Sequence, residues 1–333
     1  MMWSISRCLP LSVPLSLLFS SMASRRAFLP PATFLQSDRN ANVTIDALVE
    51  GVPPLIAPVL FNDGADIVVV AKPGNVRCVP SSNNAGRHLS DNKHSHIDLA
   101  TAVCRHFGVP DVPQSIVHRL DLATSGLVMF GLNRDATAFM HNEIRAKRVV
   151  KVYNALLAGH VGSIGETENI TFPLMRDFRR TPFVTVPTRS YVSALAEAAN
   201  KDCPPNPWLA KLLRTSNSSS ITTETVCTPE SHGYIQGKSK ATLVSMLAVT
   251  GKTHQLRVMA RQGYGTCIAG DQAYRNGGES GGLYESSREE EAEWAGDMCL
   301  NAKKIGFTHP RTKQWIWVEC ENKWDFSTTF TRQ

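Results

Sequence analysis

The segment HRLDLATSGL, residues 118–127, places a carboxylate between a guanidinium and a pair of hydroxyl groups. Asp121 follows Arg119 by two positions and precedes Thr124 and Ser125, in a stretch that the flanking patterns place in a loop between a helix and a strand. A loop carboxylate can act as a nucleophile that divides a hard displacement into two easier steps. An isolated aspartate more often caps or salt-bridges its own loop, and the spacing of this one segment favours that second interpretation.

Two further segments follow in order: KVYNAL at 151–156, and TGKTHQLRV at 250–258 with GDQAY at 270–274. Together with HRLDLATSGL they resemble the motifs HRLDxxTSGL, KxYxAL and TG[RK]THQ[IL]RV…GDxxY of the RluA-like family of RNA pseudouridine synthases. Weaker similarity at 68–73 and 300–310 extends the resemblance over most of the chain. One short motif can arise by chance, but three in the same order rarely do. The chain is therefore identified as a member of that family.

The resemblance implies an enzyme that breaks the bond between uracil and ribose, turns the base and rejoins it through carbon. This isomerisation needs no redox partner, and the sequence shows neither a GxGxxG nor a P-loop pattern. The eight cysteines form no CxxC pair and no cluster typical of a metal site. We predict no cofactor and no metal, and interpret the cysteines as core residues in a reducing compartment.

The resemblance assigns the catalytic roles to Asp121, Tyr153 and Arg257. Asp121 is the expected nucleophile, attacking either the anomeric carbon of the sugar or the uracil ring. Burial would raise its pKa, so Arg257 is expected to keep it charged. Tyr153 would stack on the uracil and could take the ring proton. The alternatives are a strand-surface phosphate contact for Arg257 and a core tyrosine for Tyr153.

The remaining site residues are predicted to bind or position RNA: His118, Arg119, Thr124, Lys151, Lys252, His254 and Gln255. The target base must leave its stack, and Arg119 could fill the vacated space or hold a neighbouring phosphate. His254 and Gln255 either line the pocket or fix the strand that we expect there. The basic residues before and after this region suggest a track for the RNA backbone, with a solvated helix end as the alternative. They are Arg145, Lys147, Arg148, Lys151, Arg176, Arg179 and Arg180.

Several positions depart from the family pattern and leave the choice of substrate open. Leu122 follows Asp121 where a charged residue is common, Met259 stands where a histidine commonly follows R-V, and Asn301 replaces a histidine. None of these changes removes a predicted catalytic residue.

The elements that position these residues alternate between strand and helix patterns. Strands are predicted at 67–71, 127–132, 152–158, 243–249 and 315–319. One helix is expected to end at Gly108, and another to begin after Asn133 as its N-cap. We predict an α+β fold of the pseudouridine synthase type: a mixed, mostly antiparallel sheet with flanking helices and a central catalytic cleft.

The chain divides into a leader and a body. Residues 1–37 contain three arginines and no lysine or acid, which is typical of a mitochondrial presequence. Residues 38–333 form the expected catalytic domain, with surface insertions near 188–220, including a short Ala-rich helix, and near 275–297. No segment is long and apolar enough to suggest a membrane span. Mitochondrial localisation is the prediction, and cytoplasmic or nuclear localisation is the alternative.

The net charge of +6 agrees with a polyanionic partner. We expect that partner to be RNA, with mitochondrial ribosomal RNA first and transfer RNA second. A different class of function is an RNA-binding ribosome assembly factor, with ribosomal assembly partners, that keeps the fold while catalysis is dispensable. A hydrolase using Asp121 with His118 or His254 is a third interpretation, but no recognisable nucleophile or metal motif accompanies it.

Overall fold

The computed structural model describes residues 35–36, 44–49, 52–80, 98–109, 112–177, 184–186, 189–201, 222–275, 296–321 and 330–333. The predicted presequence therefore lies outside the described residues except for 35–36. Most of the acidic segment near 275–297 also lies outside them, as do residues 202–221 of the other predicted insertion.

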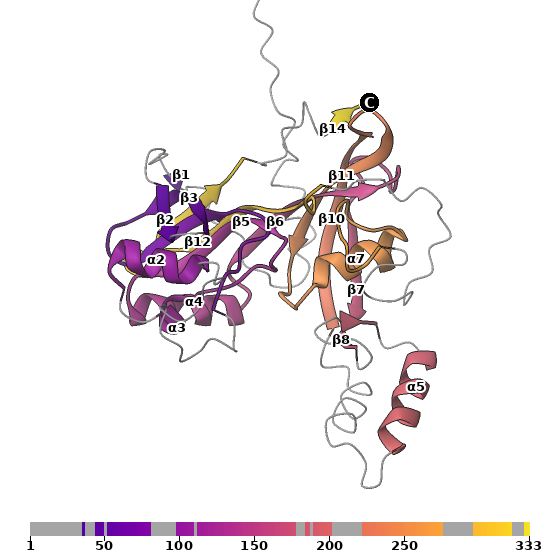
Figure 1. The fold of residues 1–333 in the computed structure, drawn as a ribbon, viewed down its shortest axis with the longest axis horizontal. Coiled ribbons are helices and arrows are strands. Elements are labelled where there is room, and N and C mark those ends of the chain that lie inside the picture. The colour runs from indigo at the N-terminus through magenta and orange to yellow at the C-terminus, as the bar shows by residue number, and fades with distance from the viewer. Residues whose placement is uncertain are drawn as a thin grey trace, which may run out of the picture.

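One large sheet organises the described part of the chain (Figure 1). Its main path runs β14-β10-β11-β6-β12-β5-β4-β3-β2, and β1, β7 and β13 join it at the side. The strands are β1 (Leu35–Gln36), β2 (Thr44–Val49), β3 (Val52–Asn62), β4 (Ile67–Lys72), β5 (Ser125–Gly131), β6 (Val150–Ala158), β7 (Glu168–Pro173), β10 (Thr222–Ile235), β11 (Ser239–Ala248), β12 (Leu300–Thr308), β13 (Trp315–Glu319) and β14 (Phe330–Arg332). Separately, β8 (Met175–Arg176) pairs with β9 (Val184–Thr185). Only the pairs β5–β12 and β1–β13 are parallel among the described strands. The predicted mixed, mostly antiparallel sheet is confirmed.

The described helices are α2 (Leu99–Phe107), α3 (Val112–Ser115), α4 (Arg134–Arg145), α5 (Arg189–Asn200) and α7 (Gln255–Tyr264). Gly108 ends α2 in the left-handed conformation, and the side chain of Asn133 caps α4 by accepting from the amide of Ala136, so both predicted helix ends are confirmed. The Ala-rich helix predicted within 188–220 is α5. In the described part of the chain, no helix combines the length and apolar character that crossing a bilayer requires.

The helices cover both faces of the sheet. Val68 and Val70 of β4 pack with α2, whereas Ile67 and Val69 of the same strand pack with α4 on the opposite face. This follows from the alternation of side chains along a strand. At the other half of the sheet, α7 packs on β6, β10 and β11 (Figure 1).

The strand expected at 255–258 is wrong, because this segment begins α7. His254 turns the chain with φ 54°, and the helix follows at once. Leu256, Met259 and Ala260 then recur at helical spacing and are buried against β6 and β11. Arg257 therefore projects from the first turn of a helix and not from a strand.

The strand β6 lies at the centre of the sheet and carries Tyr153. It is hydrogen-bonded to β11 on one side and to β12 on the other. Tyr153, Ala155 and Leu157 alternate onto the face that α7 covers, while Val150 and Val152 pack with Trp315 and Trp317 on the opposite face. A central strand with two hydrogen-bonded neighbours gives Tyr153 a rigid support.

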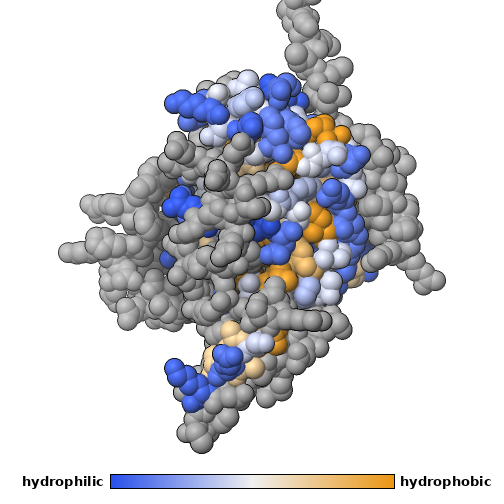
Figure 2. Space-filling model, turned by 90° about the vertical axis from the view of Figure 1, so that its right-hand side faces the viewer, coloured by the Kyte–Doolittle hydropathy of each residue, from blue (hydrophilic) through white to orange (hydrophobic). Residues whose placement is uncertain are grey.

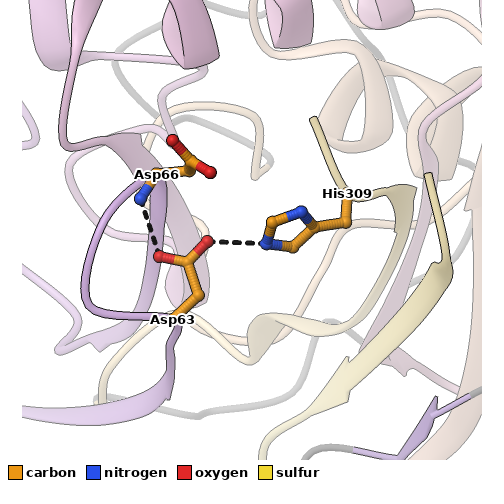
Figure 3. Close-up of side chains that lie close together, drawn as sticks. All are labelled: Asp63, Asp66 and His309. Carbon is orange, nitrogen blue, oxygen red and sulfur yellow. Dashed lines mark hydrogen bonds and ion pairs between the residues drawn. The ribbon is translucent and has the colours of Figure 1, made fainter. Parts of the chain in front are cut away.

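A polar network joins the β3–β4 turn to the β12–β13 turn (Figure 3). Asp63 in the β3–β4 turn accepts from the amides of Ala65, Asp66 and Ile67 and lies 2.6 Å from Nε2 of His309. Asp66 accepts both hydrogen bonds of the Arg311 guanidinium at 2.7 and 2.8 Å. Two carboxylates and an imidazole resemble a metal-ligand set, but both oxygens of Asp66 are already bonded to Arg311. The network therefore joins two turns of the fold.

Gly126 lets two strands approach behind the Asp121 loop. Its φ is +106°, and a Cβ atom built on it would lie 2.4 Å from the carbonyl oxygen of Ala302 in the neighbouring strand β12. Gly126 thus allows a close backbone approach that a side chain would prevent. Gly64 also has a positive φ, +77°, but no atom lies within 4 Å of its built Cβ.

The comparison of these two glycines gives a test. We expect Gly126→Ala to lower the free energy of unfolding by about 2–4 kcal/mol more than Gly64→Ala, because only Gly126 adds a steric clash to the backbone strain. Urea denaturation of both variants measures the difference. Equal losses at the two positions would contradict this account.

Candidate active site

A cavity of about 550 Å³ opens between the loop at 118–124, the strand β6 and the turn that leads into α7. The three predicted catalytic residues and the seven residues predicted to position RNA at the site all line it: His118, Arg119, Asp121, Thr124, Lys151, Tyr153, Lys252, His254, Gln255 and Arg257. These residues come from three segments between positions 118 and 257, and the fold brings them to one place.

The negative charge of Asp121 faces a buried arginine. The Oδ2 atom of Asp121 lies 3.7 Å from the guanidinium of Arg257 and 3.9 Å from Nε2 of His254. Arg257 is bonded more closely to Asp271, at 2.8 and 2.6 Å. The expected pairing of Arg257 with Asp121 is present, but the nearest carboxylate of Arg257 is Asp271. Asp271 therefore fixes the position of the guanidinium. Asp121 interacts with the same charge electrostatically, at a longer distance.

Arg257 stays charged in this setting. Burial lowers its pKa, but the hydrogen bonds and the charge of Asp271, with the charge of Asp121, outweigh burial and raise the pKa above its ordinary value. The guanidinium also lies over the ring of Tyr274, 5.0 Å from its centre. A permanent cation thus sits beside Asp121.

Tyr153 presents a neutral phenol to the cavity. Burial, and next the charge of Asp121, raise the pKa of Tyr153 well above its ordinary value. The ring packs against the core clusters on both halves of the sheet and remains partly accessible from the cavity. It can therefore offer a flat apolar face to a base and a hydroxyl that keeps its proton while Asp121 is charged.

The sequence analysis did not predict the residues that fix the backbone of the Asp121 loop. The buried ammonium of Lys72 donates to the carbonyls of Pro73, Val76 and Leu122 at 2.8, 2.8 and 3.0 Å. The amide of Leu120 donates to Sγ of Cys78 at 3.2 Å. The residues on either side of Asp121 are thus fixed. The available signal was Lys72 in the weakly similar segment at 68–73.

His118 orders the same loop. Its Nε2 accepts from the amide of Met129 in β5 at 3.3 Å. Burial, and then the charge of Lys151, lower the pKa of His118 to about 3, so the ring is neutral and able to accept.

His254 and Gln255 fix the start of α7. Nδ1 of His254 lies 2.8 Å from the hydroxyl of Tyr274, and burial lowers the pKa of His254. Gln255 accepts from Thr250 and the amide of Lys252 and donates to Glu224 and Thr225. These bonds hold the turn at 250–254 against β10. Of the two roles expected for Gln255, the geometry favours fixing the backbone, here of a turn and not of a strand.

Cations surround the mouth of the cavity. The side chains of Arg119, Arg145, Lys147 and Lys252 are exposed there. Lys151 lies deeper, and burial lowers its pKa. Arg148, also expected in the basic track, instead pairs with Glu143 through two hydrogen bonds. Arg176 is exposed on β8, whereas Arg179 and Arg180 lie outside the described residues.

Comparison with known proteins agrees with this geometry. The family model described as RNA pseudouridylate synthase matches residues 66–262. The dual-specificity RNA pseudouridine synthase RluA of Vibrio vulnificus is 28% identical over 280 residues, covering 83% of this chain and 88% of that protein. The tRNA pseudouridine synthase C of Haemophilus ducreyi is 27% identical over 205 residues, covering 61% of this chain and 70% of its own length.

A solved structure also shares the fold. Human RNA pseudouridylate synthase domain containing 1 superposes with a TM-score of 0.53 at 20% sequence identity, covering 83% of this chain and 89% of the human chain. The family model spans more than half of the chain, and its range contains the segments HRLDLATSGL, KVYNAL and TGKTHQLRV, which meet at the cavity. The chain belongs to the RNA pseudouridylate synthase family and is an RNA pseudouridine synthase, an isomerase.

Proposed function

We propose that this enzyme isomerises uridine to pseudouridine in structured RNA with Asp121 as its nucleophile. The observation that carries the proposal is the position of Asp121: at the cavity, beside the fixed cation of Arg257 and close to the neutral phenol of Tyr153. A volume of about 550 Å³ falls within the range of cavities that hold small ligands, and it can take one extruded nucleoside.

The chemistry divides between the residues as follows. The carboxylate of Asp121 forms a bond either to the anomeric carbon or to the uracil ring, and the bond between ribose and the ring nitrogen breaks. The base turns, a carbon of the ring bonds to the ribose, and that carbon loses its proton. Arg257 stabilises the carboxylate when it is free and when it leaves. Tyr153 supports the base through its ring.

The cationic mouth suits the RNA backbone. Arg119, Arg145, Lys147 and Lys252 are exposed around the cavity, where phosphates flanking an extruded nucleotide would lie. Arg119 is adjacent to the Asp121 loop and can fill the space that the base leaves.

The proposed target is mitochondrial ribosomal RNA. The composition of residues 1–37 supports the compartment. One relative is a tRNA pseudouridine synthase by name, which supports transfer RNA as the second candidate.

The first test replaces the nucleophile. We expect Asp121→Asn to lower turnover by about 10³-fold or more while the fold is kept, because an amide cannot form the covalent bond. Pseudouridine is measured by mass spectrometry of nucleosides after incubation with total RNA from cells that lack the protein. Asp135→Asn, an exposed aspartate in the first turn of α4, is the control and should keep full activity. Retained activity in Asp121→Asn would refute the proposed mechanism.

The second test separates the charge of Arg257 from its shape. We expect Arg257→Lys to lower turnover about 10- to 100-fold, because an ammonium cannot hold both oxygens of Asp271 and still face Asp121. Arg311→Lys is a control for the loss of a two-bond contact with a carboxylate, since Arg311 makes such a contact with Asp66 at an exposed turn of the sheet. The free energy of unfolding is measured for both variants together with turnover. A fall in turnover of Arg257→Lys that only follows its fall in stability would show that Arg257 acts through stability alone.

The third test concerns the target. Transcriptome-wide mapping of pseudouridine in cells with and without the protein should show the loss of sites in mitochondrial ribosomal RNA. An unchanged mitochondrial map, with sites lost elsewhere, would overturn the proposed target and leave the reaction intact. Restoration of growth by the Asp121→Asn protein would instead favour the assembly-factor role.

A further inference from the structure

A group of aromatic and basic side chains lies at the outer end of β10 and β11, away from the cavity. We call it the ring patch: His160, His232, Tyr234, Lys238 and Lys240. The rings of His160 and His232 are stacked, with centres 4.7 Å apart and planes at 4°. The ring of Tyr234 meets His160 edge-on at 5.5 Å. All three rings are partly exposed, and both lysines are exposed.

The backbone holds these rings in place. Gly159, with φ +82°, turns the chain after β6, and the hydroxyl of Thr242 donates to its carbonyl and accepts from the amide of Val161. His160 is thereby laid over β10, where its Nε2 lies 3.0 Å from the carbonyl oxygen of Gly233. Gln236 and Gly237, both with positive φ, form the tight hairpin turn that presents Lys238.

The strand register puts the ring patch on the same face of the sheet as Tyr153. In β11, Met246 pairs with Tyr153 and Thr242 pairs with Leu157, and these two β11 residues are an even number of positions apart. On the other side of β11, Thr242 pairs with His232 and Lys240 pairs with Tyr234. Side chains of directly paired residues lie on one face. The ring patch and the catalytic tyrosine therefore share a face.

The patch lies within reach of one RNA molecule bound at the cavity. Seven positions separate Tyr153 from His160, which corresponds to about 20 Å along an extended chain. Figure 2 shows the upper end of the molecule, where β14 (Phe330–Arg332) borders β10 (Figure 1), as largely hydrophilic. Accessible rings next to lysines are the combination that binds single-stranded RNA, since bases stack on the rings and phosphates meet the cations.

We propose that the ring patch is an accessory binding site for a single-stranded segment of the RNA substrate that flanks the target nucleotide. The proposal needs only that the substrate is RNA. The ring patch would add affinity for RNA at a surface of the catalytic domain that is separate from the catalytic cavity.

The test measures binding without turnover. The probe is a fluorescein-labelled oligouridylate of twelve nucleotides, and its affinity for the full-length Asp121→Asn protein is measured by fluorescence anisotropy. Adding Tyr234→Leu and Lys238→Glu should weaken binding about ten-fold or more, because a stacked base and a phosphate contact are lost. Tyr234→Phe, which keeps the ring, should bind nearly as the parent does. Arg105→Glu, a charge reversal on an exposed residue of α2, is the control for net charge. It should change the logarithm of the dissociation constant by less than half as much as Lys238→Glu alone.

Photo-crosslinking gives an answer that does not depend on altered side chains. An oligouridylate carrying 4-thiouridine should crosslink to the peptide that contains residues 232–234. Unchanged affinity in the Tyr234→Leu, Lys238→Glu protein, or crosslinks confined to the catalytic cavity, would overturn the proposal. Because no turnover is measured, this outcome is distinct from a failure of Asp121 to act as the nucleophile.

Discussion

The site depends on one buried guanidinium shared by two carboxylates. Arg257 is fixed to Asp271 by two hydrogen bonds and lies 3.7 Å from Asp121. If Asp121 alone paired with Arg257, the two groups could bond closely, and the proposed nucleophile would be less reactive. Asp271 instead compensates for the burial of the cation, since loss of one partner of a buried pair is strongly destabilising. Asp121 lies beside the same cation without a close hydrogen bond to it.

A second constraint fixes the backbone around Asp121. A buried lysine is costly unless its ammonium is bonded, and the carbonyls of Pro73, Val76 and Leu122 satisfy Lys72. Cys78 holds the amide of Leu120 on the other side of Asp121. Gly126 then allows the chain to enter β5 in contact with β12. The loop is thus fixed by the segment 72–78 and by the close approach of β5 to β12, so Asp121 reaches the cavity without relying on its own side-chain packing.

The sequence motifs predicted the residues that line the cavity better than the residues that hold them in position. All ten predicted residues line one cavity, because these motifs carry side chains whose types suit the chemistry. The segment around Arg257 was expected to be a strand and is the start of a helix, because its helical period becomes visible only when Leu256, Met259 and Ala260 are considered together. Strand β10 was not predicted, since its threonines and the irregular pairing near Pro229 hide a regular alternation. Lys72 and Asp271 act through distant backbone and side-chain partners, which no local pattern encodes.

The protonation of Tyr153 is coupled to the charge of Asp121. Burial, and next the negative charge of Asp121, raise the pKa of Tyr153, so the phenol keeps its proton in the free enzyme. A protonated phenol donates a hydrogen bond and cannot take a proton, so this cavity favours Tyr153 as a support for the base. If Asp121 forms the proposed covalent bond, its carboxylate is no longer an anion, and its contribution to the raised pKa of Tyr153 is absent. The phenolate that proton removal would require is therefore easier to form in the proposed covalent intermediate than in the free enzyme.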